Sequence, residues 1–225
     1  TMMRDAAYDM QLQTRLQNLH ALAAGVMEQI YAGDLAPHYA DLAYHYGKAN
    51  DRAQAFRYAR LAGEEAAARF ANQEAIQHFL QALQHALYLP PDQTYAERQS
   101  VYASLGELMV TTGQYEAAQE HLTHSLALAQ ESDDRDGQAR VYRWLAHLFE
   151  LRGEYALALD WVQRGIAVLS RRDTITAAEL ALVAGMIYTR QGEYEEALSQ
   201  CETALDIARQ HAELTTLARA YNLLG

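Results

Sequence analysis

The second half of the chain repeats one pattern of apolar and small positions, each time across two predicted helices. In most repeats the first helix carries a large apolar residue, a leucine three positions later and a small residue directly after it, while the third repeat has Ala184 in place of the leucine. The second helix carries small, large and small residues on one face. In the first pair these positions are Tyr102, Leu105, Gly106, Ala118, Leu122 and Ser125. Positions three and four apart share a face of an α-helix, so residues 92–225 predict three full helix pairs and the first helix of a fourth.

The pattern returns at a nearly constant interval. The glycines between the two helices of each pair, Gly113, Gly153 and Gly192, are 40 and 39 residues apart, and an alanine follows each of them at the same distance. Glycine supplies the left-handed backbone that ends a helix. Small residues let two antiparallel helices approach closely, while large ones fill the space beside them. A repeat of this length indicates a stacked array of helix pairs.

The columns resemble the tetratricopeptide repeat family, whose signature is W-x-x-L-G-x-x-Y followed by A-x-x-x-F. Tyr102, Tyr142 and Tyr221 stand in its tryptophan column. The resemblance implies an all-α, right-handed superhelical solenoid of antiparallel helix pairs. The period is longer than the usual 34 residues, and we expect the extra residues in longer helices and in loops such as 131–137. HEAT-like helix pairs share the period but lack this small-residue code.

Residues 1–91 are predicted to be helical without keeping the period, as irregular helical hairpins at 12–32, 37–48, 51–69 and 72–88. Residues 15–90 resemble the helical region that follows the ATPase module of bacterial signal-transducing (STAND-type) ATPases, which are often fused to nucleotide cyclase or other output domains. The matching pieces are His45-Tyr46, Ala62-Gly63, and Ala71-Asn72 leading into Glu74-Ala75. The resemblance implies a regulatory segment whose catalytic parts lie elsewhere.

Charge and cysteine content narrow the partners and the compartment. Eighteen basic against 29 acidic residues give a formal net charge of −11. Nucleic-acid and anionic-membrane binders need a basic face, so we expect neither partner. The single cysteine, Cys201, excludes an internal disulfide framework. It fits a reducing compartment, and with no signal peptide or bilayer-spanning run we expect a cytoplasmic location.

Both ends of the chain indicate a larger protein. The chain begins with Thr1 rather than methionine, and it ends on a predicted helix that is still apolar at Tyr221 and Leu224. A terminal repeat normally carries a polar outer face. We therefore expect the natural protein to continue beyond residue 225.

No catalytic motif is present in the sequence. A P-loop requires G-x-x-x-x-G-K-[ST], but the only lysine, Lys48, precedes an alanine. His121 and His124 lie at i, i+3 and could share a metal, although solvated histidines explain them better because no third ligand is suggested nearby. Cys201 falls in a core column and is predicted to be a buried, inert thiol. We expect no enzyme activity, cofactor or metal.

A binding surface follows from the family resemblance, which places the first helix of each pair on the concave side. The positions expected to be exposed there are Arg140, Arg143, His147, Glu150, Glu179, Leu182, Met186, Thr189, Arg190, Arg219 and Asn222. Arginine recognises carboxylates through paired hydrogen bonds, so one hypothesis is a groove for an acidic or C-terminal peptide. The alternative is that these arginines pair internally with Glu107, Glu150 and Glu179.

These expectations describe a non-catalytic interaction scaffold or sensor module of a larger bacterial signalling ATPase, which binds a peptide or protein on its concave face. Ala103 and Glu107 stand where chaperone-binding members carry lysine and asparagine, so that specific partner is not expected. A second interpretation is self-association through uncapped solenoid ends. An enzyme with an unrecognised helical site is the least favoured.

Overall fold

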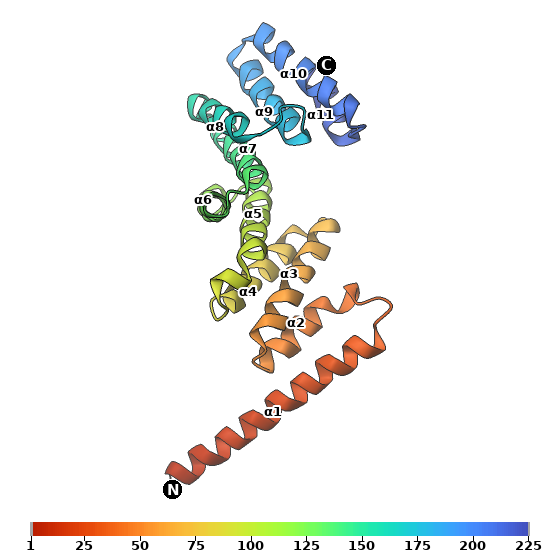
Figure 1. The fold of residues 1–225 in the computed structure, drawn as a ribbon, viewed down its shortest axis with the longest axis vertical. Helices are drawn as coiled ribbons and strands as arrows, with labels where there is room; N and C mark the ends of the chain where they lie inside the picture. The colour runs from red at the N-terminus through yellow and green to blue at the C-terminus, as the bar shows by residue number, and fades with distance from the viewer. Residues whose placement is uncertain (1, 225) are drawn as a thin grey trace. The chain divides into compact units, whose positions relative to one another are not determined.

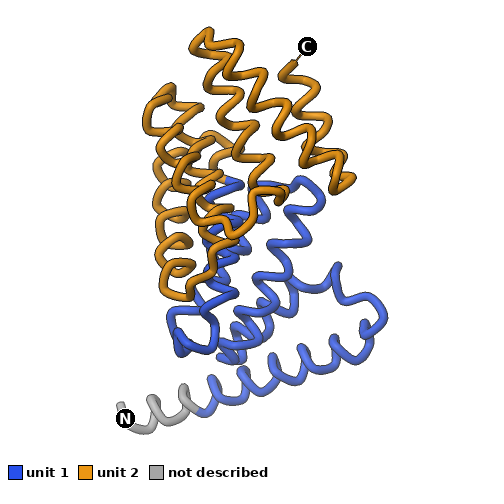
Figure 2. Tube along the Cα trace, turned by 45° about the horizontal axis from the view of Figure 1, so that its top comes forward, with its two compact units in different colours: residues 1–108 blue, residues 109–225 orange. Residues whose placement is uncertain are grey.

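A computed structural model describes residues 2–224, with no side-chain detail before residue 11. Those residues form eleven α-helices and two short 3-10 helices, and no strand occurs among them (Figure 1). The chain divides into two compact units, residues 1–108 and 109–225, and the division falls inside helix α5 (Figure 2). The predicted all-α class is confirmed. The division predicted at residue 92 concerns repeat regularity and stays a prediction.

Unit 1 is a series of helices in which each one packs on the next, α1 on α2, α2 on α3 and α3 on α4. Its elements are α1 (Met2–Ile30), η1 (Ala36–His38), α2 (Tyr39–Lys48), α3 (Arg52–Ala68), α4 (Asn72–Ala86), η2 (Pro91–Gln93) and the larger part of α5 (Tyr95–Thr111). Helices α2 to α4 lie close to their predicted ranges, whereas α1 begins ten residues earlier than the predicted helix at 12–32.

Close approach of α3 and α4 shows why the sequence needs small residues there. The Phe79 side chain is 1% exposed, and its ring packs directly over Gly63. A Cβ atom at Gly63 would lie 2.7 Å from two atoms of that ring. Alanines on both helices, such as Ala59 and Ala75, are fully buried and allow the same contact.

Unit 2 contains α6 (Tyr115–Glu131), α7 (Arg135–Leu151), α8 (Tyr155–Val168), α9 (Ile175–Gln191), α10 (Tyr194–Gln210) and α11 (Leu214–Leu224). Helices α7 and α8 form one pair and α9 and α10 the next, while the first helices α7, α9 and α11 contact one another in turn. The predicted antiparallel helix pairs are therefore confirmed within this unit.

The turns inside the pairs have the predicted backbone. Gly113, Gly153 and Gly192 adopt φ values of 77°, 76° and 80°, in the left-handed region that glycine enters without strain. The expected long loop at 131–137 is wrong. Helix α6 runs to Glu131 and α7 begins at Arg135, where the Asp134 carboxylate accepts a hydrogen bond of 2.9 Å from the Gly137 amide. The extra residues of the repeat lie in helices of 17 residues and, after the 14-residue α8, in the inter-repeat loop 169–174.

Cys201 lies where α9, α10 and α11 meet. A Cβ atom at Gly185 would lie 3.3 Å from the Cys201 Sγ atom and 3.2 Å from Leu223. The cysteine is 1% exposed, and burial raises the pKa of its thiol. The prediction of a buried thiol is confirmed, and a protonated thiol is a poor nucleophile.

Candidate functional site

The surface formed by α7, α9 and α11 brings the predicted binding residues together. We call this surface the first-helix face. It contains Arg140, Arg143, Trp144, His147, Glu150, Glu179, Leu182, Met186, Arg190, Arg219 and Asn222. The three helices lie in neighbouring repeats of unit 2 and contact one another in order, so side chains from all three can interact.

One ion-pair cluster joins all three helices through Glu179 of α9. Its Oε2 atom lies 3.3 Å from Arg143 Nε of α7, and its Oε1 atom lies 3.9 Å from the Arg219 guanidinium of α11. The Arg143 guanidinium also lies over the Trp144 ring, 4.1 Å from its centroid. Arg143 is 8% exposed, and this cluster holds it within the protein.

A second cluster surrounds the buried carboxylate of Glu150, which is 1% exposed. Its Oε2 atom lies 3.1 Å from His147 Nδ1, and its Oε1 atom lies 2.5 Å from Arg190 Nε of α9. The contact with Arg190 is an ion pair between α7 and α9. Burial alone would raise the pKa of Glu150, but His147 and Arg190 outweigh it and hold that pKa below its usual value.

The two clusters change the predicted exposure of the surface. Arg143 and Glu150 were expected to be exposed, and both are buried because each is enclosed by an oppositely charged partner from the next repeat. The internal pairing expected as the alternative is present at Glu150 and Glu179. Arg140, Arg190 and Arg219 keep between 39% and 60% of their side-chain surface exposed. Among the arginines of the first-helix face, these three are therefore accessible to a ligand in solution.

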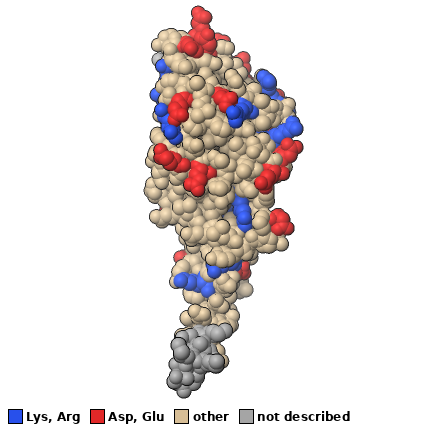
Figure 3. Space-filling view, turned by 90° about the vertical axis from the view of Figure 1, so that its left-hand side faces the viewer, with Lys and Arg blue, Asp and Glu red and all other residues tan. Residues whose placement is uncertain are grey.

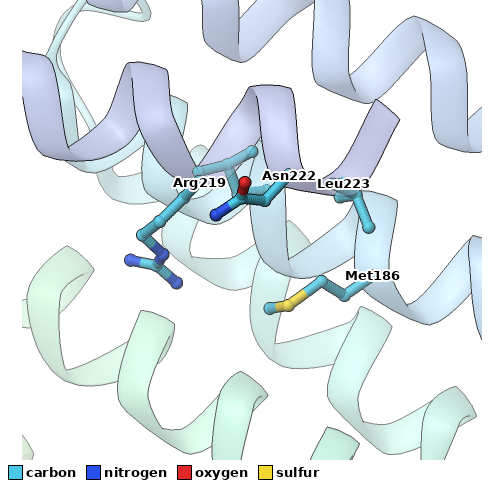
Figure 4. Close-up of a pocket in the computed structure, with 5 residues that line it drawn as sticks. Met186, Arg219, Asn222 and Leu223 are labelled. Carbon is cyan, nitrogen blue, oxygen red and sulfur yellow. The ribbon is translucent and has the colours of Figure 1, made fainter. Parts of the chain in front are cut away.

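A hollow of about 220 Å³ lies between α9 and α11. Leu182, Met186 and Leu223 supply its apolar wall, while Arg219 and Asn222 supply polar atoms. Figure 4 shows Arg219 and Asn222 projecting from α11 toward the space that Met186 enters from α9. The hollow therefore combines an apolar surface with one guanidinium and one amide.

Trp144 was not among the residues predicted for this face. It lies four residues after Arg140 and three before His147, and these are partly or fully exposed positions along α7. Its ring centroid is 5.9 Å from that of His147. The i, i+4, i+7 spacing from Arg140 could have identified it, but the repeat pattern marks only its neighbours Leu145 and Ala146 as columns.

The other candidate features concern metal binding, the His121 side chain, membrane-spanning helices and surface charge. Among the described residues, no three His, Cys, Asp or Glu side chains are grouped so that they could hold a metal ion. Burial lowers the pKa of His121 and so favours its neutral form. No helix in the described part of the chain is both long and apolar enough to cross a membrane. On the face drawn in Figure 3, basic and acidic side chains are interspersed.

Family models for the tetratricopeptide repeat match residues 97–171 and residues 181–214. These two segments therefore resemble tetratricopeptide repeats. They include most of α5, all of α6, α7, α8 and α10, and α9 from residue 181 onward. Tetratricopeptide repeats act as protein-interaction scaffolds.

Solved structures with the same tetratricopeptide-like fold share little sequence with the chain. BtubC (BKLC) from P. vanneervenii matches with a TM-score of 0.59 at 14% identity, over 89% of this chain and 92% of its own. Repeats of a putative kinesin light chain from Podosopora anserina match with a TM-score of 0.61 at 16% identity, over 89% and 98%. At this identity the matches establish the fold alone.

A third structure is the Rap conjugation gene regulator of the plasmid pLS20, solved in complex with the Phr* peptide. It matches with a TM-score of 0.64 at 16% identity over 88% of this chain, which spans 55% of the regulator's length. No curated protein sequence matches the chain. The resemblance of residues 15–90 to signalling ATPases has no support from these comparisons and stays a hypothesis.

Proposed function

We propose that unit 2 is a non-catalytic module that binds an extended peptide or protein segment along the first-helix face. The observation that carries the proposal is the hollow between α9 and α11, where an apolar wall adjoins a guanidinium and an amide. Peptide sites commonly combine an apolar pocket for an anchor side chain with a few fixed polar groups. The peptide complex of the structurally similar Rap regulator supports this use of the fold.

The charges of the face favour an acidic ligand. Arg219 lies 3.9 Å from Glu179, farther than Arg143 does, so its guanidinium is the more loosely held of the two. A ligand carboxylate would compete with Glu179 for Arg219, while Asn222 offers both a donor and an acceptor to a peptide backbone. An aliphatic side chain beside an Asp or Glu is the sequence that fits this arrangement.

A random peptide library displayed on phage tests the proposal. The full chain should enrich peptides in which an aliphatic residue adjoins an acidic one. Fluorescence anisotropy of a selected peptide should show at least a tenfold loss of affinity for Arg219→Glu, since a lost hydrogen bond to a charged group costs about 1.5–3 kcal/mol and about 1.4 kcal/mol is tenfold. Met186→Arg should show a comparable loss, because it places a charge in the apolar wall of the hollow.

Arg164→Glu is the matched control, because Arg164 is exposed on the second helix α8 and pairs there with Asp160 at 2.8 Å. Its affinity should equal that of the wild type. Equal binding by all three variants, or the absence of any enriched peptide, would refute the proposal.

We also propose that the module belongs to a larger signalling protein, a proposal that rests on the resemblance of residues 15–90. The open reading frame around this segment tests it directly. A G-x-x-x-x-G-K-[ST] motif encoded upstream in the same frame is the expected result. A frame without an NTPase or output domain would contradict the proposal and would leave peptide binding by unit 2 unaffected.

A further inference from the structure

One side of α1 is fixed against the rest of unit 1. Ala24 is fully buried, and the Nδ1 atoms of His20 and His45 lie 3.0 Å apart. The Glu28 carboxylate accepts hydrogen bonds from the hydroxyls of Tyr46, at 2.8 Å, and Tyr58. These contacts tie α1 to α2 and α3 and determine which side of the helix remains outward.

The outward side carries a continuous row of aliphatic side chains, which we call the outer stripe. Each is between 41% and 68% exposed: Leu12, Leu16, Leu19, Leu22, Val26 and Ile30. Single exposed leucines are ordinary, but a contiguous row of this kind on one helix marks an interaction surface. Nothing in the described part of the chain covers it.

The spacing of the stripe specifies a helix as its partner. Five of the stripe residues, together with the partly exposed Ala23, follow one another at alternating intervals of four and three residues: Leu12, Leu16, Leu19, Ala23, Val26 and Ile30, with Leu22 beside this series. This is the a/d spacing of a coiled coil, in which apolar residues of one helix insert between those of another. The stripe continues for about 28 Å at 1.5 Å per residue, which gives it five turns of contact.

The charges around the stripe exclude other occupants. Arg15 is the one basic residue between positions 11 and 31, whereas helices that lie on membranes carry a polar face rich in lysine and arginine. The stripe itself carries no charge that would select an acidic or basic peptide. The one acidic residue between positions 11 and 31, Glu28, faces Tyr46 and Tyr58 rather than the stripe. A second copy of α1 presents the same apolar spacing, and identical surfaces pair across a two-fold axis.

We propose that two copies of the chain associate through the outer stripes of their α1 helices, with a helix-to-helix seam of the coiled-coil type. The site is separate from the first-helix face of unit 2. It is also separate from the end of α11, where the exposed Leu214 and Tyr221 would serve the end-to-end association expected from the sequence.

Light scattering coupled to size exclusion, run on the full chain over a wide concentration series, measures the association. The wild type should change from monomer to dimer as concentration rises. Leu19→Glu/Val26→Glu should remain monomeric, with a dissociation constant raised at least 100-fold, because it places carboxylates in an apolar seam. Circular dichroism should show an unchanged helix content, since both positions are exposed in the monomer.

Leu214→Glu/Tyr221→Glu is the matched control at α11, and it should dimerise like the wild type. Dimer loss in this variant instead of the α1 variant would overturn the proposal in favour of association through the ends. A wild type that stays monomeric at every concentration would also overturn it.

Cross-linking locates the seam. Cys201 is buried, so Leu19→Cys introduces a single accessible thiol on the stripe. Asn18→Cys places one on an exposed position off the stripe. A short bismaleimide should yield covalent dimers of Leu19→Cys far more efficiently than of Asn18→Cys. Equal yields from the two variants would contradict a seam formed by α1.

Discussion

Replacing Glu150 with glutamine should destabilise unit 2 by about 2 kcal/mol at neutral pH. Removing one member of a fully buried ion pair costs roughly 3–5 kcal/mol, because the other charge is left uncompensated. Here Arg190 keeps 51% of its side-chain surface exposed and can be solvated. This solvation places the expected loss below that range, whereas the shape of the Glu150 side chain is nearly unchanged in glutamine.

The pH dependence of this loss has a definite sign. The pKa of Glu150 is lowered in the folded protein from its usual value of 4.5, so the unfolded chain binds the proton more readily. The stability that this carboxylate contributes is therefore present above pH 4.5 and is lost as pH falls through the folded pKa. The difference between the wild type and Glu150→Gln should shrink as the solution is acidified past the usual value.

Urea unfolding followed by circular dichroism, at neutral pH and at a series of acidic pH values, measures both effects. Glu154→Gln is the matched control, because Glu154 pairs with Arg152 at 2.8 Å but keeps 43% of its side chain exposed. It should cost less than about 1 kcal/mol, as exposed pairs do. Equal losses for the two variants, or a Glu150→Gln loss that does not depend on pH, would refute this reasoning.

Three further outcomes follow from the packing. Gly63→Ala should lower the free energy of unfolding by roughly 1–3 kcal/mol, because its Cβ atom meets the buried Phe79 ring. Gly25→Ala, on an open helix surface, should raise the free energy of unfolding by roughly 0.5–1 kcal/mol, and thermal melts of the two variants check these opposite signs. Phe70 has a φ of 60° and is 89% exposed, so Phe70→Asn should raise the melting temperature by relieving about 1 kcal/mol of backbone strain. A lower melting temperature would show instead that the Phe70 ring makes a stabilising contact. Cys201 should react with a thiol reagent only at the rate of unfolding, and rapid labelling of the native protein would contradict its burial.

The sequence predicted the fold well because the determinants of a helix pair are local. Gly113, Gly153 and Gly192 have the left-handed backbone that their column requires. Gly185 lies in the predicted close contact, with Cys201 beside it. The loop expected at 131–137 was wrong because the Asp134 carboxylate accepts a hydrogen bond from the Gly137 amide, which lets α7 begin at Arg135. The period of apolar positions does not record such a capping bond.

The candidate site was predicted only in part. The spacing identified the helices of the first-helix face and most of its residues. It could not determine that Arg143 and Glu150 are buried, because their burial depends on partners contributed by the next repeat. The hollow beside Met186 likewise depends on how α9 and α11 pack, which involves Leu223, a residue outside the repeat columns.

The ion pairs of the first-helix face also affect how an array of helical repeats can lengthen by gene duplication. Arg190 follows Glu150, and Arg219 follows Glu179, at the interval of the repeat itself. Each pair therefore links a helix to its counterpart one repeat later. A gene duplication that copied one repeat would place the same residue at neighbouring places of such a column, so glutamate would face glutamate and arginine would face arginine at the new junction. A duplication of two repeats together would keep acidic and basic residues alternating and would leave a buried carboxylate such as Glu150 paired.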